Sequence, residues 1–545
     1  MHSRPYDSAN LDDILFGAGP GFDLCNVMSL PGLGLPGLGL EEPSEQPQTT
    51  ETTQHELSSG SEWRFEVAFG KCVKVRLLNG TAELFGTELI EGPTYTFSGT
   101  KAAIFTHHGC TLEISNDAPQ SEYSAEETPM AEYVNVHFAL ETLRNEAQAR
   151  GRDGPRVLVL GPSNAGKTSL LKTLTAYAIR LGRQPIVVNL DPEEGVLSLP
   201  GTLTAAAIRA LLDVEEGWGS SPMSGPSAIP VKLPLVYNYG LCDPVADDRS
   251  AAHYKAVLSK LALAVSGRLS EDPLAKEAGV LIDTPGTLAN TTKSLASNII
   301  QHIVSEFSIS HVLILGSERL YSDILRRFEN KPTSSTTSNH HHNETITVAK
   351  LSKSGGCVDR DMAFMRSFRA AQIRAYFFGT GHLTNGITLS PRQQQVDFNQ
   401  LAIYRLLIGD QDPTNATVSA DLFRPGGQDD NDDEDEDIYN PTTNHSLKSQ
   451  HPAAAAAAEG GAGTIFQRLT SPTPALQSHI LAIMNADPDA TEEDIQTSGV
   501  IGFLYVAEVD ETRGKISLLS PVAGRVPRRA IVWSRGWPEE VVGIV

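Results

Sequence analysis

The sequence predicts an α/β protein in which a parallel sheet is flanked by two smaller domains. An apolar strand, a glycine-rich loop and an amphipathic helix follow one another across residues 157–174. Further apolar strands alternate with helical segments, a pattern typical of a parallel sheet. Short stretches of alternating apolar and polar residues come earlier, as in a small β-sandwich. We therefore expect a P-loop NTPase-type parallel sheet between an N-terminal all-β sandwich and a small C-terminal α+β domain.

The composition indicates an intracellular protein of several domains. A chain of 545 residues is too long for one core. Its 43 basic and 66 acidic residues give a net charge of −23, so we expect it to repel nucleic acid at long range. The five cysteines show no CxxC spacing, which argues against a disulfide framework or a zinc site. No apolar run is as long as a membrane span, and the first residues lack the basic region followed by an apolar one that is typical of a secretory signal, so we expect a soluble protein.

The N-terminal part divides into two regions. Residues 1–55 are rich in Gly, Pro, Ser, Thr and Gln without periodicity, and we expect them to be disordered. Residues 56–133 form the expected β domain, because Trp63, Phe65 and Val67 alternate with polar residues and similar short strands follow. A helix from about residue 134 to residue 150 then leads into the central domain.

The central domain, expected over residues 134–387, contains the strongest motif. Residues 161–168 match the pattern G-x-x-x-x-G-K-[ST] directly after an apolar strand. Its glycines let consecutive backbone N–H groups face an anion, and the following helix adds its positive N-terminal end. Lys167 can reach the β- and γ-phosphates of a nucleotide, and the Thr168 hydroxyl can hold Mg²⁺. An ordinary glycine-rich turn is the alternative, but the flanking strand favours a phosphate-binding loop.

Two further strands of this domain end in carboxylates. The strand at residues 185–191 ends in Asp191, and the strand at residues 279–283 ends in Asp283. Ligands of parallel sheets bind at the carboxyl ends of the strands, so both side chains are expected beside the loop. Each could bind Mg²⁺ through water, accept a proton or cap a helix. Residues 283–286 also match the D-x-x-G switch of GTPases, but the sequence has no N-K-x-D guanine motif, which argues against a GTPase.

The rest of the chain offers fewer signals. Arg360 and Arg366 are candidates to close over a nucleotide, although a solvated helix face explains them equally well. An insert at about residues 330–345 carries His340–His342, and we interpret it as a polar insert rather than a metal site. The C-terminal domain is expected over residues 388–545, with an acidic low-complexity insert at about residues 425–475.

From about Glu62 to its end, the chain resembles the polynucleotide 5′-hydroxyl kinase family. The resemblance is specific to the fungal subunit of the pre-mRNA cleavage and polyadenylation factor (cleavage factor IA) that has this kinase fold. Outside the loop, the segments that carry it are residues 62–66, 82–89, 101–106, 181–183, 234–237, 318–321 and 353–356.

This resemblance implies three domains, with ATP and Mg²⁺ between the first two. Asp191 matches the catalytic base and Arg360 a lid arginine, and Thr168 and Asp191 would hold the metal, the latter through water. Glu62 and Lys101 match contacts to the base, and the loop matches the phosphate contacts. The expected nucleotide-binding residues are thus Glu62, Lys101, Gly161, Asn164, Ala165, Gly166, Lys167, Thr168 and Ser169.

Three segments differ from active members of the family. Residues 285–287 replace a Gly-Trp clasp for RNA, and Met365 replaces a second lid arginine, with Arg366 adjacent. Residues 192–194 are Pro-Glu-Glu instead of Val-Gly-Gln, which adds negative charge near the phosphates. Losing a transition-state arginine can cost about 10³ in rate, and losing a stacking aromatic about 1–3 kcal/mol per base. ATP binding needs neither, so a nucleotide binder without kinase activity is favoured.

The resemblance therefore implies a structural subunit of the nuclear machinery that cleaves and polyadenylates pre-mRNA. ATP would be a structural ligand, and the partners would be the large scaffold subunit of cleavage factor IA and other 3′-end processing subunits. Pre-mRNA would be contacted only indirectly, with no membrane or DNA partner. The alternative is an active ATP-dependent polyribonucleotide 5′-hydroxyl kinase, with Asp191 as base and Arg360 and Arg366 closing the lid. A slow ATPase switch is a third hypothesis.

Overall fold

The computed structural model describes residues 52–215, 234–290, 294–333, 345–379, 388–409 and 464–544. Of residues 1–55, which were expected to be disordered, residues 1–51 lie outside the described ranges. The last residues of this segment correct the prediction, because β1 (Thr53–Leu57) pairs with β8 along its whole length. This strand could not be predicted from its sequence, because Thr-Gln-His-Glu has no alternating apolar residues. The strand lies at the edge of its sheet and is mostly exposed. Most of the two predicted inserts, including His340–His342 and the acidic run, also lies outside the described residues.

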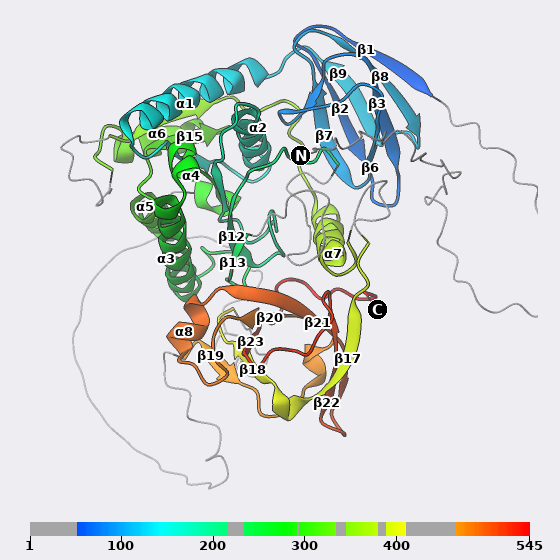
Figure 1. Ribbon diagram of the computed structural model, residues 1–545, viewed down its shortest axis with the longest axis vertical. Helices are drawn as coiled ribbons and strands as arrows, with labels where there is room; N and C mark the ends of the chain where they lie inside the picture. Colours follow the sequence, from blue (N-terminus) through cyan, green and yellow to red (C-terminus); the bar gives the residue numbers. More distant parts are fainter. Residues whose placement is uncertain are drawn as a thin grey trace, which may run out of the picture. The chain divides into compact units, whose positions relative to one another are not determined.

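The N-terminal domain is a sandwich of two antiparallel sheets, as predicted (Figure 1). One sheet has the strand order β1-β8-β3-β6 and the other β5-β4-β7-β2-β9. Between them Trp63 and Phe65 stack with ring centroids 4.4 Å apart. The remaining strands are β2 (Glu62–Val67), β3 (Val73–Gly80), β4 (Glu83–Leu84), β5 (Thr87–Glu88), β6 (Thr94–Phe97), β7 (Thr100–Phe105), β8 (Cys110–Asn116) and β9 (Ser121–Ala125).

A long helix, α1 (Met130–Arg150), connects the sandwich to the central domain. It begins four residues before the predicted start, directly after Pro129, whose fixed φ suits the first turn of a helix. Gly151 ends it with a left-handed φ of 64°. The side chain of Arg144 is fully buried, and its Nε donates to the carbonyl of Ala278 at 3.0 Å. This contact fixes α1 to the central domain.

The central sheet has the order β13-β12-β11-β14-β10-β15-β16. Strands β11, β14, β10, β15 and β16 are parallel, as predicted, but β12 and β13 pair antiparallel at one edge. Sequence reasoning missed β12 because its run of Thr and Ala lacks the large apolar residues of the other strands. The bounds are β10 (Arg156–Leu160), β11 (Ile186–Asn189), β12 (Thr202–Ala207), β13 (Leu235–Asn238), β14 (Val280–Asp283), β15 (His311–Leu315) and β16 (Thr347–Leu351).

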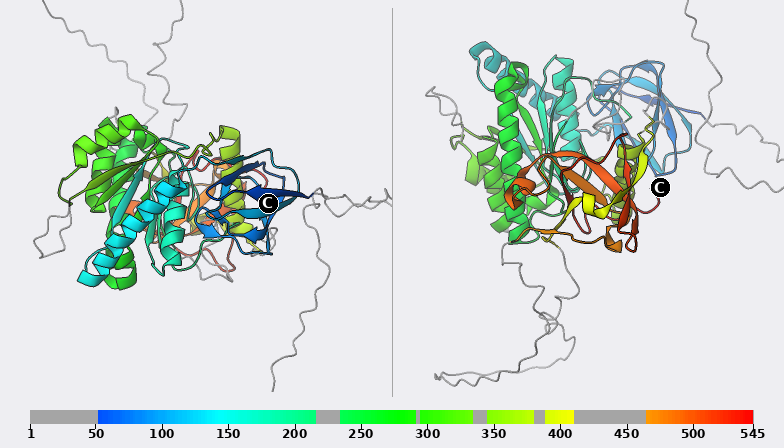
Figure 2. Two further views of the ribbon diagram at one scale, coloured as in Figure 1. Left: turned by 90° about the horizontal axis from the view of Figure 1, so that it is seen from above. Right: turned by 60° about the horizontal axis from the view of Figure 1, so that its bottom comes forward.

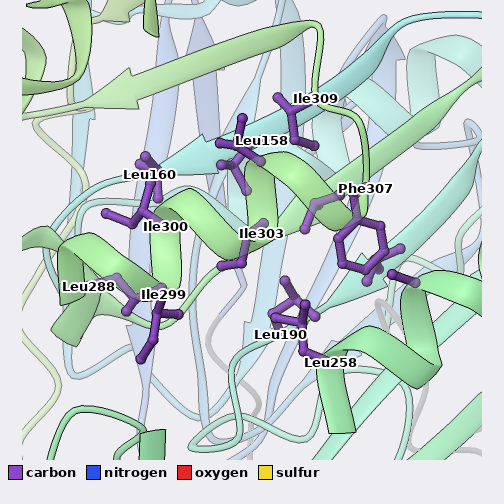
Figure 3. Close-up of a cluster of buried hydrophobic side chains, with 14 of the residues drawn as sticks. Leu158, Leu160, Leu190, Leu258, Leu288, Ile299, Ile300, Ile303, Phe307 and Ile309 are labelled. Atoms are coloured by element: carbon purple, nitrogen blue, oxygen red, sulfur yellow. The ribbon is translucent and has the colours of Figure 1, made fainter. Parts of the chain in front are cut away.

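Helices cover both faces of this sheet (Figure 2). Leu158 and Leu160 face one core and Val157 and Val159 the other, because successive strand residues point to opposite faces. Figure 3 shows Ile299, Ile300 and Ile303 of one helix packed against the first face. Besides α1, the helices are α2 (Lys167–Arg180), α3 (Asp248–Glu271), α4 (Pro273–Ala278), α5 (Ser294–Glu306) and α6 (Glu318–Phe328), with the 3₁₀ turn η2 (Gly286–Ala289).

The last helix of the central domain, α7 (Met362–Phe378), leads into a seven-stranded C-terminal sheet. The sheet has the order β17-β22-β21-β20-β23-β18-β19, and β18 and β23 are its parallel pair. Its elements are β17 (Arg392–Asp397), η3 (Phe398–Gln400), β18 (Ala402–Leu406), β19 (Phe466–Arg468), η5 (Pro474–Leu476), β20 (Ile480–Met484), α8 (Glu492–Thr497), β21 (Val500–Asp510), β22 (Lys515–Ser520) and β23 (Ala530–Trp533). Since β19 lies within the predicted insert, that insert ends earlier than residue 475. Across the described ranges, no helix is long and apolar enough to cross a bilayer.

Candidate nucleotide-binding site

A cavity of about 340 Å³ lies between the β-sandwich and the phosphate loop. Strands β2 and β7 and the start of α1 line one side, and residues 163–169 line another. The segment that precedes α7, residues 354–360, completes the wall. The cavity is thus bounded by parts of the chain almost 300 residues apart in sequence, from Glu62 to Arg360.

The phosphate loop has the conformation that its glycines were expected to allow. Gly166, at the start of α2, has a φ of 88°, and Asn164 has a φ of 57°. A Cβ atom on Gly166 would lie 2.7 Å from Sγ of Cys357, so a larger residue does not fit there. The Nζ of Lys167 donates to the carbonyl of Pro162 at 3.0 Å, which holds the ammonium over the loop. This arrangement suits a phosphate chain.

The carboxylates at the strand ends lie beside the loop, as predicted. Asn189 and Asp283 are register partners on β11 and β14, so the chain reaches Asp191 two residues later at the same edge. The Thr168 hydroxyl donates to Oδ2 of Asp283 at 2.5 Å. Burial raises the pKa of Asp191 to about 8, with the charge of Glu194 adding to the effect and Lys167 opposing it. Burial likewise raises the pKa of Asp283.

These oxygens fit a hard divalent cation such as Mg²⁺, which prefers carboxylate and hydroxyl ligands and phosphate oxygens. A cation would also offset the cost of burying the two carboxyl groups. Within the described residues no group of three His, Cys, Asp or Glu forms a metal cluster. A metal at this site would therefore depend on phosphate and water ligands in addition to the protein.

Arg360 is held at the cavity wall by two partners. Its Nε donates to Oδ1 of Asn164 at 3.0 Å, and its guanidinium forms an ion pair with Glu194. Burial raises the pKa of Glu194, but the charge and hydrogen bond of Arg360, together with the charges of Lys167 and Lys172, lower it below its usual value. Glu194 thus adds negative charge beside Asp191, as expected, but it is ion-paired with Arg360. Oε1 of Glu193 likewise lies 3.7 Å from Nη1 of Arg369.

The neighbouring arginine, Arg366, contacts the C-terminal domain and not the cavity. Arg366 lies outside the cavity with 73% of its side chain exposed, and its Nε donates to Oε2 of Glu539 at 3.4 Å. Met365 lines the cavity instead. At the edge where active kinases have an RNA clasp, Gly286 lies so close to the loop that a Cβ would be 2.5 Å from the backbone N of Ser163. The expected lid pair of Arg360 and Arg366 is therefore not assembled.

Both predicted base contacts lie at the cavity. Glu62 accepts from Nε of Arg64 at 2.5 Å and from the hydroxyl of Thr128 at 2.9 Å. The Nζ of Lys101 lies 2.9 Å from Oε2 of Glu66. The loop residues Asn164, Gly166, Lys167, Thr168 and Ser169 also line the cavity. Gly161 and Ala165 do not, since Ala165 is buried in the core and a Cβ on Gly161 would lie 2.9 Å from the carbonyl of Leu315.

Sequence reasoning missed the apolar part of the wall. Single alanines or aromatic residues in strands and helices carry no signal of their own, because the same residues fill ordinary cores. The segments at 82–89 and 101–106 that carry the resemblance contain four of these residues, but the resemblance gave them no role in the site. The missed wall residues include Phe85, Ala102, Ala103, Phe105, Pro129, Met130, Tyr133, Cys357 and Val358.

Comparison with known proteins identifies the family. Three family models match in chain order: the N-terminal β-sandwich domain of polyadenylation factor at residues 56–147, the mRNA cleavage and polyadenylation factor CLP1 P-loop at residues 161–379, and pre-mRNA cleavage complex II protein Clp1 at residues 389–539. A CLP1 of Coccidioides immitis is 51% identical over 95% of this chain and 100% of its own. The chain belongs to the Clp1 family. A clp1 of Emericella nidulans is also 51% identical, over 94% of this chain and 100% of its own, and supports the same family.

Solved structures of Clp1 family members confirm the fold. A Clp1p–Pcf11p complex superimposes with a TM-score of 0.68 at 26% identity, covering 88% of this chain and 97% of that one. A second structure, of the extended interface between Pcf11p and Clp1p and of a point mutant that loses ATP, matches with the same TM-score at 25% identity. The predicted resemblance to the cleavage and polyadenylation branch is thus confirmed, in agreement with nucleotide binding at the P-loop.

Proposed function

We propose that this Clp1 family member holds ATP and Mg²⁺ in the cavity as a structural ligand of the nuclear pre-mRNA 3′-end processing complex. In that role it supports endonucleolytic cleavage without turning ATP over. Nuclear action is expected because its relatives are mRNA cleavage and polyadenylation factors. By analogy with the Clp1p–Pcf11p complex, its partner is a segment of the scaffold subunit of cleavage factor IA.

Each part of the cavity has a role in this proposal. The loop and Lys167 hold the phosphates, and Thr168 and Asp283 provide oxygens for Mg²⁺, with Asp191 acting through water. Mg²⁺ would neutralise part of the phosphate charge. Glu62, Lys101 and the apolar wall enclose the base. Because the β-sandwich and the central domain both contribute, a bound nucleotide links the two.

The proposal that ATP is retained rather than consumed rests on the ion pair between Arg360 and Glu194. Phosphoryl transfer needs cations that meet the charge developing on the transferred group. Arg360 is already neutralised by Glu194, and the position next to Arg366 that lines the cavity is Met365. The cavity therefore has the groups needed for binding, but among the described residues that line it there is no uncommitted arginine for the transition state.

One observation favours the alternative, an active polyribonucleotide 5′-hydroxyl kinase. Asp191 lines the cavity, and burial raises its pKa to about 8. A carboxylate with a raised pKa accepts a proton more readily, as a general base for a 5′-hydroxyl must. The missing second arginine weighs more heavily, so structural binding remains the proposal.

The proposal is tested by measuring the nucleotide that copurifies with the protein. We expect close to one ATP per chain on denaturation of the wild type, and little in Lys167→Ala, which loses the ammonium over the phosphates. A bound ligand at a thousandfold excess over its Kd adds about 4 kcal/mol of stability, so Lys167→Ala should also unfold at a lower temperature. A wild type that carries ADP or no nucleotide would contradict structural ATP.

A further inference from the structure

The β4–β5 hairpin of the sandwich is fixed to α2, the helix that follows the phosphate loop. Glu83, on β4, is only 4% exposed although it carries a carboxyl group. Its Oε1 accepts a hydrogen bond from the hydroxyl of Tyr177, and its Oε2 accepts one from Nη1 of Arg180 at 3.2 Å. Nη2 of Arg180 also donates to Oε2 of Glu88, on β5, at 3.1 Å. These contacts join the two domains through residues that do not line the nucleotide cavity.

The turn of this hairpin has an unusual residue at its first position. Phe85 and Gly86 form the two-residue turn between β4 and β5, with φ values of 47° and 81°. A turn with two positive φ values favours Asn, Asp or Gly at its first position, and a bulky side chain is rare there. Such a strained conformation persists only where the surrounding contacts hold it, and it is typical of functional sites.

The helix α2 supplies those contacts. A Cβ on Gly86 would lie 2.9 Å from the carbonyl oxygen of Thr173, so the turn rests directly on the backbone of the helix. Glu83 anchors the hairpin to α2 on the other side of Phe85. The strained residue is therefore held between two attachments to the same helix.

The strained residue is also the one that reaches the nucleotide cavity. Phe85 lines the cavity, whereas Glu83 and Gly86 do not. Residues 167 and 173 of α2 line it as well, and a helix rises about 1.5 Å per residue, so the turn lies about 9 Å along α2 from Lys167. Since Lys167 is at the phosphate end, Phe85 lies where the nucleoside of a bound nucleotide would be.

We propose that Glu83 is a positioning residue, which holds Phe85 against the nucleoside of bound ATP by fixing the hairpin to α2. This inference rests on the proposed function, because it assumes that ATP occupies the cavity. Without the contacts of Glu83, the strained turn relaxes in a part of the molecules. ATP then binds fully only to the remaining fraction, and its apparent Kd rises by the inverse of that fraction. The attachment of the sandwich to α2 thus sets how tightly ATP is held.

A purely structural role of Glu83 predicts a different result. A buried carboxylate that accepts hydrogen bonds from two side chains stabilises the folded state whether or not a ligand is bound. Its removal would lower the unfolding temperature but leave the ATP affinity of the folded molecules unchanged. Affinity is therefore measured well below the unfolding temperature of each variant, and stability is measured separately.

The test is a double-mutant cycle on ATP affinity, by calorimetry with Mg²⁺-ATP and the full-length protein freed of nucleotide. We expect Glu83→Gln to raise the Kd about tenfold, because it removes the charge-assisted hydrogen bond from Arg180. Phe85→Ala, which removes the aromatic contact, should also raise the Kd about tenfold. Because Glu83 acts through Phe85, the double variant should again show about a tenfold rise, whereas independent effects would multiply to about a hundredfold rise.

The matched control is Glu113→Gln. Glu113 also belongs to the sandwich and forms an ion pair, with Arg76 at 3.6 Å, but it lies in the other sheet and outside the cavity. It should bind ATP like the wild type. If Glu83→Gln does not fold, Tyr177→Phe replaces it, since this change removes only the hydroxyl that donates to Glu83.

Two results would overturn the inference. One is a Glu83→Gln variant that binds ATP as tightly as the wild type, and the other is a double variant whose Kd rises by the product of the two single effects. Both leave the proposed function in place, because the wild type still binds ATP. A wild type that binds no ATP would refute the proposed function and this inference with it.

Discussion

At the scale of single residues, Arg360 connects two segments that determine how the cavity behaves. One partner, Asn164, belongs to the phosphate loop, and the other, Glu194, follows Asp191. The side chains of Arg360 and Glu194 are only 25% and 15% exposed, so water screens their attraction weakly. Both side chains line the cavity, and the pairing engages the arginine that transfer chemistry would need.

Replacing Glu194 by Gln should destabilise the protein and loosen its nucleotide. The change leaves the Arg360 charge unpaired in a partly buried position, for which we expect a loss of about 2 kcal/mol. Urea unfolding gives the free energy, and filtration after dilution gives the rate of ATP release. Glu318→Gln is the control, because the Lys350–Glu318 pair is exposed and should contribute less than about 1 kcal/mol. Equal effects of both substitutions would refute this role of Glu194.

His253 gives a prediction about pH. It is 2% exposed, its Nε2 lies 2.9 Å from the carbonyl of Tyr239, and its Nδ1 lies 2.8 Å from Nε2 of Gln496. The carbonyl needs a donor and the amide nitrogen needs an acceptor, so the ring is neutral with its proton on Nε2. Burial accordingly lowers the pKa of His253 from 6.5 to about 4.

Since only the unfolded state takes up this proton below pH 6.5, stability is complete above that value and falls as the pH drops towards 4. We expect a loss of about 2 kcal/mol by about pH 5, measured by urea unfolding. The variant His253→Gln keeps a donor for Tyr239 but does not titrate. The wild type should therefore lose more stability than the variant, and parallel pH profiles of the two proteins would contradict the assignment.

At the scale of elements, α7 joins the nucleotide cavity to the C-terminal sheet. Ile373, Tyr376 and Phe377 belong to the core that also contains residues of β20 and β21. On the same helix, Nη2 of Arg369 donates to Oε1 of Glu539 at 3.0 Å, and its guanidinium lies 4.7 Å from the ring of Trp537. Toward the central domain, Nε2 of Gln372 donates to the carbonyl of Gly195 at 2.7 Å. The helix is thus fixed to both domains, which limits the movement that a kinase lid requires.

Two arginines of α7 that contact the same carboxylate provide a matched pair of variants. Arg369 is 5% exposed, so Arg369→Ala removes a buried guanidinium together with its ion pair to Glu539 and its contact with Trp537, and should cost about 3 kcal/mol. Arg366 reaches Glu539 from the surface, and Arg366→Ala should cost less than about 1 kcal/mol. Thermal unfolding of both variants checks this difference. If Arg366→Ala proves the more damaging, α7 is not anchored through Arg369.

The elements differ in how far the sequence predicts them. β10, the loop and α2 follow from local patterns, namely a run of buried apolar residues, two glycines and an amphipathic helix. β12 and β1 do not, because their Thr, Ala and polar residues form strands only through their neighbours in the sheet. At the site, the sequence predicted that the carboxylates at the ends of two strands lie beside the loop. It did not predict the pairing of Arg360 with Glu194. The two residues are 166 positions apart, and the charge pattern alone gave Arg360 no partner.

At the scale of the whole molecule, the nucleotide cavity requires three distant segments to be in place at once. Lys101 comes from the sandwich, Lys167 from the central sheet and Arg360 from the segment before α7. A ligand that binds only this assembled state stabilises all three contacts together. ATP retained in this way would present the surface to which a scaffold subunit docks, and turnover would release the assembly at each cycle.

The fate of the γ-phosphate distinguishes ATP that is retained from ATP that is consumed. The protein is loaded with γ-labelled ATP and incubated with an RNA oligomer that has a 5′-hydroxyl end, with Lys167→Ala as the blank. We predict that the label stays on the protein as intact ATP and that labelled RNA does not exceed the blank. Labelled RNA above the blank would contradict retention and show that the protein is a kinase.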